Sequence, residues 1–426
     1  MSARDIIEVL AIMLAAGLVS ELLANALRLP RMIVLLAAGA ILGPHVLEAL
    51  ELPLDSAGVQ ILLTLGVSMI LFHGGLGLSA RVLQQVAVGL GLLAIPGVIL
   101  TAVVTGAVAA AAFGLPFENG LLIGAVLSSS DPAILIPLLE RMRVRPKVVQ
   151  TIIAESAFND VTGAVLSLAV AAFVLEGEGS LAEPLWEFVK DLGISTGLGV
   201  VFGLALAVVV SNRRIGVLRE TPAVAALLIV SASYYSIDSA GGSGYLGAFL
   251  AGLIVANMDV LRLGMHSEPE HRLEDFAALA ADIVVIFVFI TLGANLPFDT
   301  FGDYALPALG TLAAFIFVAR PLTVLTSLLP DRRGQWTRGE IAFISWTRET
   351  GVVPAAVAGL LVSQGVANGD ELVTTVALAI IVTLLLQSTT KPWLAGRLGL
   401  NEPDIVELEA ESEPFPATGG ELSSRE

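Results

Sequence analysis

The chain has 426 residues, of which 56% are hydrophobic and only 14% are charged, and it contains no cysteine. So many apolar residues exclude both a soluble globular enzyme and an intrinsically disordered chain. The absence of cysteine excludes disulfides, iron–sulfur clusters and thiolate zinc sites, and the net charge of −17 argues against nucleic-acid binding. The composition therefore indicates a membrane protein.

About thirteen apolar stretches follow one another along the chain, and a helix needs roughly 20 such residues to cross a bilayer. In chain order they are 6–27, 31–47, 57–79, 84–112, 120–141, 148–175, 187–211, 221–237, 243–259, 274–296, 303–328, 339–364 and 371–396. The residues from 401 to 426 are mostly acidic or small, so we expect them to form a solvated tail. The sequence predicts an all-α transmembrane domain over 1–400 and an acidic tail over 401–426.

The segments between the stretches alternate in charge. Basic residues follow the odd-numbered stretches, as at Arg81, Arg145 and Arg219, whereas acidic residues such as Glu51 and Glu118 follow even-numbered ones. Because cytoplasmic loops carry an excess of Lys and Arg, this pattern places the N-terminus outside and the tail in the cytoplasm. We expect a multi-pass protein of the cell inner membrane or plasma membrane.

Two of the stretches carry helix-breaking residues at matching positions. The fifth contains Pro132 and Pro137, and the twelfth contains Gly351 and Pro354. A proline inside a membrane helix frees main-chain carbonyls, which protein, water or an ion must then satisfy. Stretches seven apart in the series run in opposite directions, as the halves of an inverted repeat do. The pattern predicts inverted repeats with two interrupted helices, typical of transporters, although proline also occurs routinely in other membrane helices.

Five charged residues lie within predicted membrane helices: Asp131, Glu155, Asp160, Arg348 and Glu349. Each charge costs about 2.5–3.5 kcal/mol on insertion scales, so five unpaired charges would cost about 12–17 kcal/mol, comparable with the stability of a whole protein. They must be paired, hydrated or neutralised by protonation. Salt bridges that join helices are one explanation. We favour the other, a transport site, because ionisable residues inside membranes mark ion pathways.

The sixth stretch indicates how such a site would work. Ser156 and Asp160 are four positions apart and share a helix face, while Glu155 and Asn159 form a second stripe turned by about 100°. A carboxylate beside a hydroxyl and freed carbonyls suits a small cation. Burial of the same carboxylate favours its protonated form, so a proton and a cation compete for Asp160. This competition is an exchange mechanism, in which the occupied site changes sides and the empty, charged site does not.

The motif Ser-Asp-Pro at 130–132, followed by Glu-Ser-Ala-Phe-Asn-Asp at 155–160, resembles the paired signature of the monovalent cation/proton antiporters of the NhaP/NHE type. Arg348 and the residues after it resemble the arginine region of that family's second crossed helix. The resemblance covers essentially all of 1–400. It implies the antiporter fold, with about thirteen helices, inverted repeats, two crossed and interrupted helices, and a homodimer.

In that fold a moving core carries the ion past a dimerisation domain. The resemblance assigns the core to about 84–175 and 303–396, and the dimerisation helices to about 6–79 and 221–296.

The same resemblance assigns cation and proton binding to one cluster: Asp160, Ser156, Ser130, Asp131 and Asn159. Within it, Asp160 and Ser156 would bind the transported cation with help from the region of Ser130, and Asn159 and Asp131 would organise the crossed helices. A structural ion pair would join Glu155 and Arg348. Family members with Asn-Asp are similar to electroneutral exchangers, which implies one proton for one cation.

Two positions depart from the family pattern. His73 stands where the family often carries an acid that helps to bind the ion, and an imidazole is a weaker ligand for a hard cation. This departure makes potassium an alternative to sodium, while a histidine satisfied by a backbone carbonyl at a helix end fits the sequence equally well. Glu349 directly follows Arg348 and could compete with Glu155 for that arginine. We treat His73 and Glu349 as modulators of the site.

Two further basic residues lie within or at the end of predicted helices. Arg320 precedes Pro321, and we expect it to have a structural role, reaching carbonyls or a carboxylate such as Asp282. Lys391 lies near the end of the last stretch and contributes to the basic cytoplasmic side.

The sequence therefore predicts a sodium/proton antiporter, with potassium/proton exchange as the alternative. A cation channel is an alternative of a different class, but it would need a continuous polar pore. An intramembrane hydrolase lacks a His or Lys base beside Ser156 and Asp160, so we expect no enzyme activity. The expected partners are monovalent cations, protons, the lipid bilayer and a second copy of the chain, with no cofactor and no nucleic acid.

Overall fold

The structure, a computed structural model, describes residues 3–27, 29–53, 56–140, 142–176, 182–212, 216–265 and 267–401. The secondary structure of the described residues consists of helices joined by turns and irregular segments, with one isolated bridge between Val144 and Asn401. The all-α class predicted from the sequence is confirmed. The acidic tail expected at 401–426 lies outside the described residues beyond Asn401.

The described residues before the gap at 177–181 form the helices α1 (Ala3–Leu27), α2 (Arg31–Leu42), α3 (Ala57–Leu76), α4 (Ala80–Ala94), α5 (Pro96–Phe113), α6 (Phe117–Leu127), α7 (Pro132–Glu140) and α8 (Pro146–Glu176). The stretch expected at 84–112 is divided into α4 and α5 at Ile95, where the next residue is a proline without a backbone donor. The stretch expected at 120–141 is divided into α6 and α7.

The described residues after that gap form α9 (Ala182–Val210), α10 (Pro222–Ser239), α11 (Gly244–Ala256), α12 (Ser267–Ala294), η1 (Phe298–Thr300), α13 (Phe301–Ala314), η2 (Phe315–Ala319), α14 (Arg320–Leu328), α15 (Arg338–Trp346), α16 (Val352–Ser363), α17 (Gly369–Val382), η3 (Thr383–Ser388) and α18 (Thr389–Arg397). The segment η1 is a 3₁₀ turn, and η2 and η3 are π-helical turns within longer helices. The stretch expected at 339–364 is divided into α15 and α16.

Eight helical segments of the described chain are long and apolar enough to cross a membrane. The remaining predicted stretches correspond to shorter or interrupted helices, and α2, α6, α11 and α16 have only 11 to 13 residues each. The multi-pass prediction is therefore supported, while the total of about thirteen crossings stays a prediction.

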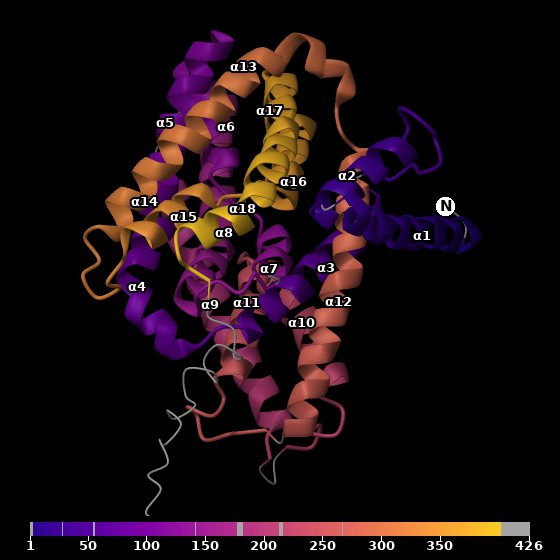
Figure 1. Cartoon of the computed structure of the whole chain (residues 1–426), viewed down its shortest axis with the longest axis vertical. Coiled ribbons are helices and arrows are strands. Elements are labelled where there is room, and N and C mark those ends of the chain that lie inside the picture. The colour runs from indigo at the N-terminus through magenta and orange to yellow at the C-terminus, as the bar shows by residue number, and fades with distance from the viewer. Residues whose placement is uncertain are drawn as a thin grey trace, which may run out of the picture.

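The helices pack in two groups. In the first, α5 lies against α6 and α13, and α13 lies against α17, as Figure 1 shows at upper left. In the second, α12 lies against α2 and α3, and α11 lies against α3 and α9. Helix α7 packs against α8, and α15 packs against α8 and α18; all four appear near the middle of the view in Figure 1. The groups resemble the predicted core and dimerisation helices, but that division into moving and fixed parts remains a proposal.

Glycines allow the backbones to touch within each group. A Cβ atom on Gly106 of α5 would lie 2.6 Å from the Cα atom of Leu121 in α6. In the second group, a Cβ atom on Gly252 of α11 would overlap the carbonyl oxygen of Phe72 in α3. Since lipid is as apolar as the helix surfaces, close packing of this kind holds membrane helices together.

Candidate functional site

Two interrupted helices cross at the centre of the molecule. Residues 128–131 separate α6 from α7, and residues 347–351 separate α15 from α16. Asp131 joins the two breaks, because its backbone N–H donates to the carbonyl of Glu349 over 2.9 Å and its Oδ2 accepts from the N–H of Val352 over 2.6 Å. A Cβ atom on Gly351 would collide with the Asp131 carboxylate, which explains the glycine. The matching breaks of the fifth and twelfth stretches therefore meet in space.

The free ends of the interrupted helices are matched by opposite charges. Arg348 donates to the carbonyl of Ser128 just after α6, and Arg320 donates to the carbonyls of Ile344 and Thr347 at the end of α15, over 3.2 and 3.1 Å. The Asp131 carboxylate lies at the start of α16. A helix carries partial negative charge at its C-terminal end and partial positive charge at its N-terminal end, so each of these contacts is favourable.

Glu155 of α8 binds chiefly Arg320. Both carboxylate oxygens accept from the Arg320 guanidinium, with Nη2 at 2.9 Å from Oε2, whereas Nη1 of Arg348 lies 3.6 Å from Oε1. The sequence analysis expected Arg348 as the partner of Glu155, and the structure adds Arg320 as the closer one. The expected contact of Arg320 with Asp282 is wrong, because Asp282 binds Arg31 over 3.2 Å. All three members of the Glu155 cluster are almost fully buried.

The side chains of Ser156 and Asn159 in α8 bind the first break at Ser130. The Ser130 hydroxyl donates to Ser156 Oγ over 3.1 Å, and Ser156 in turn donates to the Ser130 carbonyl over 3.2 Å. The backbone N–H of Ser130 donates to Asn159 Oδ1 over 3.0 Å. The structure therefore brings together these three residues, which the sequence analysis had placed in one cluster.

Asp160 lies beside the same break but is bound differently. Ser129 donates a hydrogen bond to its Oδ1, while its Oδ2 is buried and has no hydrogen-bond partner. Among the described residues, no Lys or Arg forms an ion pair with Asp160. Sequence reasoning named Ser130 and missed Ser129. The only signal was the run of three serines at 128–130, and because this run is not helical, no periodicity tells which serine faces α8.

Glu349 and His73 lie away from the positions expected for them. Glu349 pairs with Lys391 of α18 and does not compete for Arg348, so that expectation is wrong. Lys391 is itself fully buried, so it is the partner of Glu349 and not a solvated charge at the end of the last stretch. The Nε2 atom of His73, in α3, lies 3.0 Å from Glu140 at the end of α7, and His73 makes no hydrogen bond to Asp160 among the described contacts.

The donor set around Asp160 suits a monovalent cation. In the described chain, no group of three or more Asp, Glu, His or Cys side chains converges as a metal-binding cluster would. The Asp160 carboxylate accepts from the Ser129 hydroxyl, and the break beside it carries the hydroxyl and carbonyl oxygens of Ser130, which bond Ser156 of α8. Such hard, weakly charged ligands fit small alkali cations or a proton better than a transition metal.

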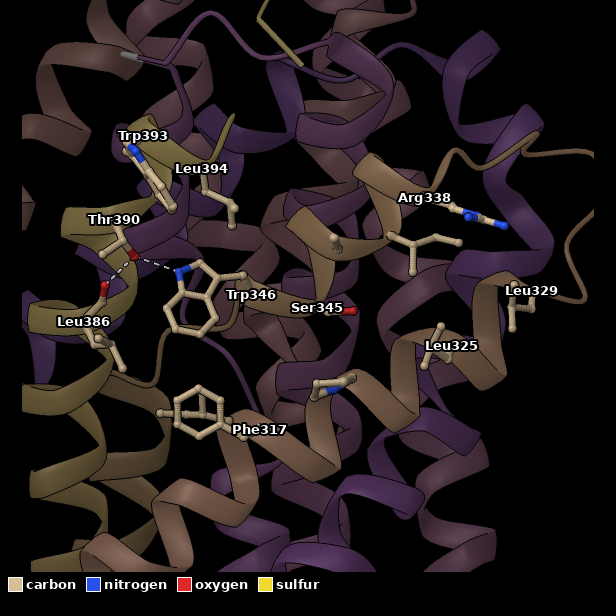
Figure 2. Close-up of a pocket in the computed structure, with 14 residues that line it drawn as sticks. Phe317, Leu325, Leu329, Arg338, Ser345, Trp346, Leu386, Thr390, Trp393 and Leu394 are labelled. Atoms are coloured by element: carbon tan, nitrogen blue, oxygen red, sulfur yellow. Dashed lines mark hydrogen bonds between the residues drawn. The ribbon is translucent and has the colours of Figure 1, made fainter. Parts of the chain in front are cut away.

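A separate apolar groove lies between α14, α15 and α18. It has a volume of about 930 Å³ and is lined mainly by apolar side chains, among them Phe317, Leu325 and Trp393. Figure 2 shows Trp346 at its centre, with Nε1 donating to the Thr390 hydroxyl over 2.8 Å. None of the predicted site residues lines this groove, so it is not the site at the crossing.

Comparison with known proteins gives one consistent result. The family model described as "Sodium/hydrogen exchanger, transmembrane" matches residues 10–396. A "Probable Na(+)/H(+) antiporter 2" of Methanocaldococcus jannaschii is 26% identical over 363 residues, which cover 83% of this chain and 84% of that protein. The "K(+)/H(+) antiporter NhaP" of Alkalimonas amylolytica is 27% identical over 398 residues, covering 93% of this chain and 67% of that protein.

Solved structures agree with these matches. The structure of the sodium proton antiporter MjNhaP1 from Methanocaldococcus jannaschii at pH 8 has a TM-score of 0.74 and 25% sequence identity, and the match covers 94% of this chain and 100% of that one. An electron-microscopy structure of the same antiporter has a TM-score of 0.77 and covers 97% of this chain.

Proposed function

Because the chain belongs to the sodium/hydrogen exchanger family, we propose that it exchanges one monovalent cation for one proton at Asp160. The predicted family, the antiporter fold and monovalent cation/proton antiport are confirmed by the family model, the relatives and the solved structures. The binding residues and the stoichiometry are the proposal.

The unpartnered oxygen of Asp160 is the observation that carries the proposal. Oδ2 of Asp160 is buried without a hydrogen bond, and the side chain is only 5% exposed. A buried carboxylate that is neither paired with a base nor fully hydrogen-bonded is costly. Either a proton or a cation removes that cost, and the single free oxygen position cannot hold both.

Neighbouring hydroxyls complete the proposed cation site. Ser156 lies one helical turn before Asp160, and its hydroxyl bonds the hydroxyl and the carbonyl of Ser130. Rotation of these hydroxyl groups turns oxygen lone pairs toward a cation at Asp160. Asn159 and Asp131 hold the interrupted segments in place, which supports a positioning role for both.

The charges at the crossing support electroneutral exchange. Arg320 and Arg348 contribute two positive charges, and Asp131, Glu155 and Asp160 contribute three negative charges. The crossing therefore has a net charge of −1 when Asp160 is empty and becomes neutral when one proton or one monovalent cation binds. Because an unpaired charge inside a membrane costs about 2.5–3.5 kcal/mol, movement of the loaded site is favoured over movement of the empty one.

Sodium is the proposed cation and potassium is the alternative. The relatives include proteins named as Na⁺/H⁺ and as K⁺/H⁺ antiporters. His73 was the reason to doubt sodium, but its imidazole contacts Glu140 and not Asp160. Proton movement in one proteoliposome preparation, driven in turn by sodium, potassium and lithium gradients, decides among the cations.

Exchange by an Asp160→Asn variant tests the proposed site. We expect cation-driven proton movement in proteoliposomes to fall to the level of empty vesicles, because an amide neither binds a proton at physiological pH nor carries the charge that attracts a cation. Asp299→Asn, which removes an exposed carboxylate, is the matched control and should keep wild-type exchange. Substantial exchange by Asp160→Asn would exclude Asp160 as the carrier.

We also propose that the N-terminus lies outside and that the tail lies in the cytoplasm of a prokaryotic cell. Independently of this orientation, we propose that the protein is a homodimer. Helix α1 extends away from the other helices (Figure 1), and its Leu18 and Leu22 are 70% and 71% exposed. Since the chain has no cysteine, single-cysteine variants give clear results. Leu22→Cys should cross-link between two copies in membranes, while buried Leu206→Cys should not.

A further inference from the structure

The second interruption contains a buried ion pair that the exchange mechanism does not use. Glu349 follows α15, and its Oε1 accepts from the ammonium group of Lys391 and from the Ser388 hydroxyl, the latter over 3.0 Å. Both charged side chains are fully buried. Replacing a buried ion pair by apolar residues is often neutral or stabilising, so stability alone gives a weak account of this pair.

The two interruptions have a similar plan. Each is bound by the helical stretch that comes after the interrupted pair: Ser130 N–H donates to Asn159 of α8 over 3.0 Å, and Thr350 N–H donates to Thr383 of η3, which continues α17, over 3.3 Å. At each break a buried carboxylate accepts from a serine hydroxyl, but the positions are exchanged: Asp160 of α8 accepts from Ser129 in the first break, and Glu349 in the second break accepts from Ser388 of η3. A further difference is the ammonium group of Lys391 beside Glu349.

Several buried side-chain oxygen atoms on the chain segments of Glu349 and Ser388 have no hydrogen-bond partner. They are Oε2 of Glu349, Oγ1 of Thr350 and Oε1 of Gln387. Thr350 adjoins Glu349 and Gln387 adjoins Ser388 in the chain, but neither of their side-chain oxygens bonds Lys391, so Oε2 of Glu349 is the unpartnered oxygen of the ion pair itself. A carboxylate held by a serine hydroxyl is a hard oxygen ligand, which suits a monovalent cation, whether an alkali ion or an ammonium group.

We propose that the Glu349 carboxylate, held by the Ser388 hydroxyl, forms a second monovalent-cation site, whose permanent occupant is the ammonium group of Lys391. The inference rests on the proposed function in that it explains why one site exchanges: a cation covalently attached to the chain cannot leave, so Glu349 stays neutralised throughout the cycle. Exchange is then confined to Asp160, and the stoichiometry is one proton for one cation.

Rescue of a Lys391→Ala variant by n-propylammonium tests this proposal. The probe carries the three carbons and the ammonium group that the substitution removes. We expect its chloride salt to raise the melting temperature of the purified variant by at least about 3 °C relative to tetramethylammonium chloride at equal ionic strength. The wild type and Glu349→Gln/Lys391→Ala, which lacks the carboxylate, should show no such difference.

Equal melting temperatures of Lys391→Ala in the two salts would overturn the proposal. If that variant does not fold in ordinary buffer, it should be expressed and purified with n-propylammonium present throughout. If Lys391→Ala is recovered as folded protein only when n-propylammonium is present, the site is supported. If Lys391→Ala does not fold even with n-propylammonium while Glu349→Gln/Lys391→Ala does fold, the site is overturned. The melting-temperature assay does not depend on transport. If Asp160→Asn still exchanged ions, the proposed function would be refuted, but the result of the n-propylammonium assay on Lys391→Ala would be unaffected.

Discussion

Glu155 and Asp160 are two carboxylates on the same helix, and their surroundings are opposite. Glu155 accepts two hydrogen bonds from Arg320 and lies 3.6 Å from Arg348. Asp160 accepts from a single serine hydroxyl and keeps one buried oxygen without a partner. Both are buried, so burial does not distinguish them. Charge compensation, and not depth, therefore separates a carboxylate that joins helices from one that can exchange its occupant.

Loss of the Glu155 carboxylate should have the largest effect on stability. Glu155→Gln leaves two buried guanidinium groups without a counter-charge, and breaking a buried pair in this way costs about 3–5 kcal/mol. Asp160→Asn, by contrast, removes an uncompensated charge and should not lower stability. Thermal unfolding of both variants in detergent measures the difference. Equal loss of stability in the two would contradict the distinction between the carboxylates.

Loss of the Ser129 hydroxyl should have an intermediate effect, confined to exchange. Ser129→Ala removes the hydrogen bond to the charged form of Asp160, which is worth about 1.5–3 kcal/mol for a charged acceptor. We therefore expect apparent cation affinity in proteoliposomes to fall by about tenfold, because the proton then competes better. Ser167→Ala is the matched control, because Ser167 lies on the helix that carries Asp160 but its hydroxyl donates to the Gly163 carbonyl. Unchanged affinity of Ser129→Ala would place the exchanging oxygen elsewhere.

Loss of the His73 side chain should have the smallest effect. The imidazole pairs with a half-exposed Glu140, and a pair of this kind contributes about 0–1 kcal/mol. We expect His73→Ala to change apparent sodium affinity by less than about twofold, because His73 does not contact Asp160. A change of tenfold or more, measured in the same proteoliposomes, would return His73 to the ion site.

The charges within one helix were predictable, but their partners were not. The spacing of Ser156, Asn159 and Asp160 follows from helical periodicity, and all three lie at the first interruption as expected. Arg320 comes from a helix far along the chain, and no single-sequence pattern indicates that it meets Glu155. The pairing of Lys391 with Glu349 was missed for a similar reason, because basic residues at the ends of membrane helices ordinarily indicate a cytoplasmic loop.

The sequence by itself determined that the chain is helical, crosses a membrane repeatedly and contains two helix breaks beside unusual charges. These features are local, since they depend on hydropathy, on the missing backbone donor of proline and on the cost of a charge in lipid. Only the tertiary structure decided which carboxylate is neutralised. That choice depends on which helices lie side by side, and electrostatic pairing acts over a few ångströms between segments far apart in the chain.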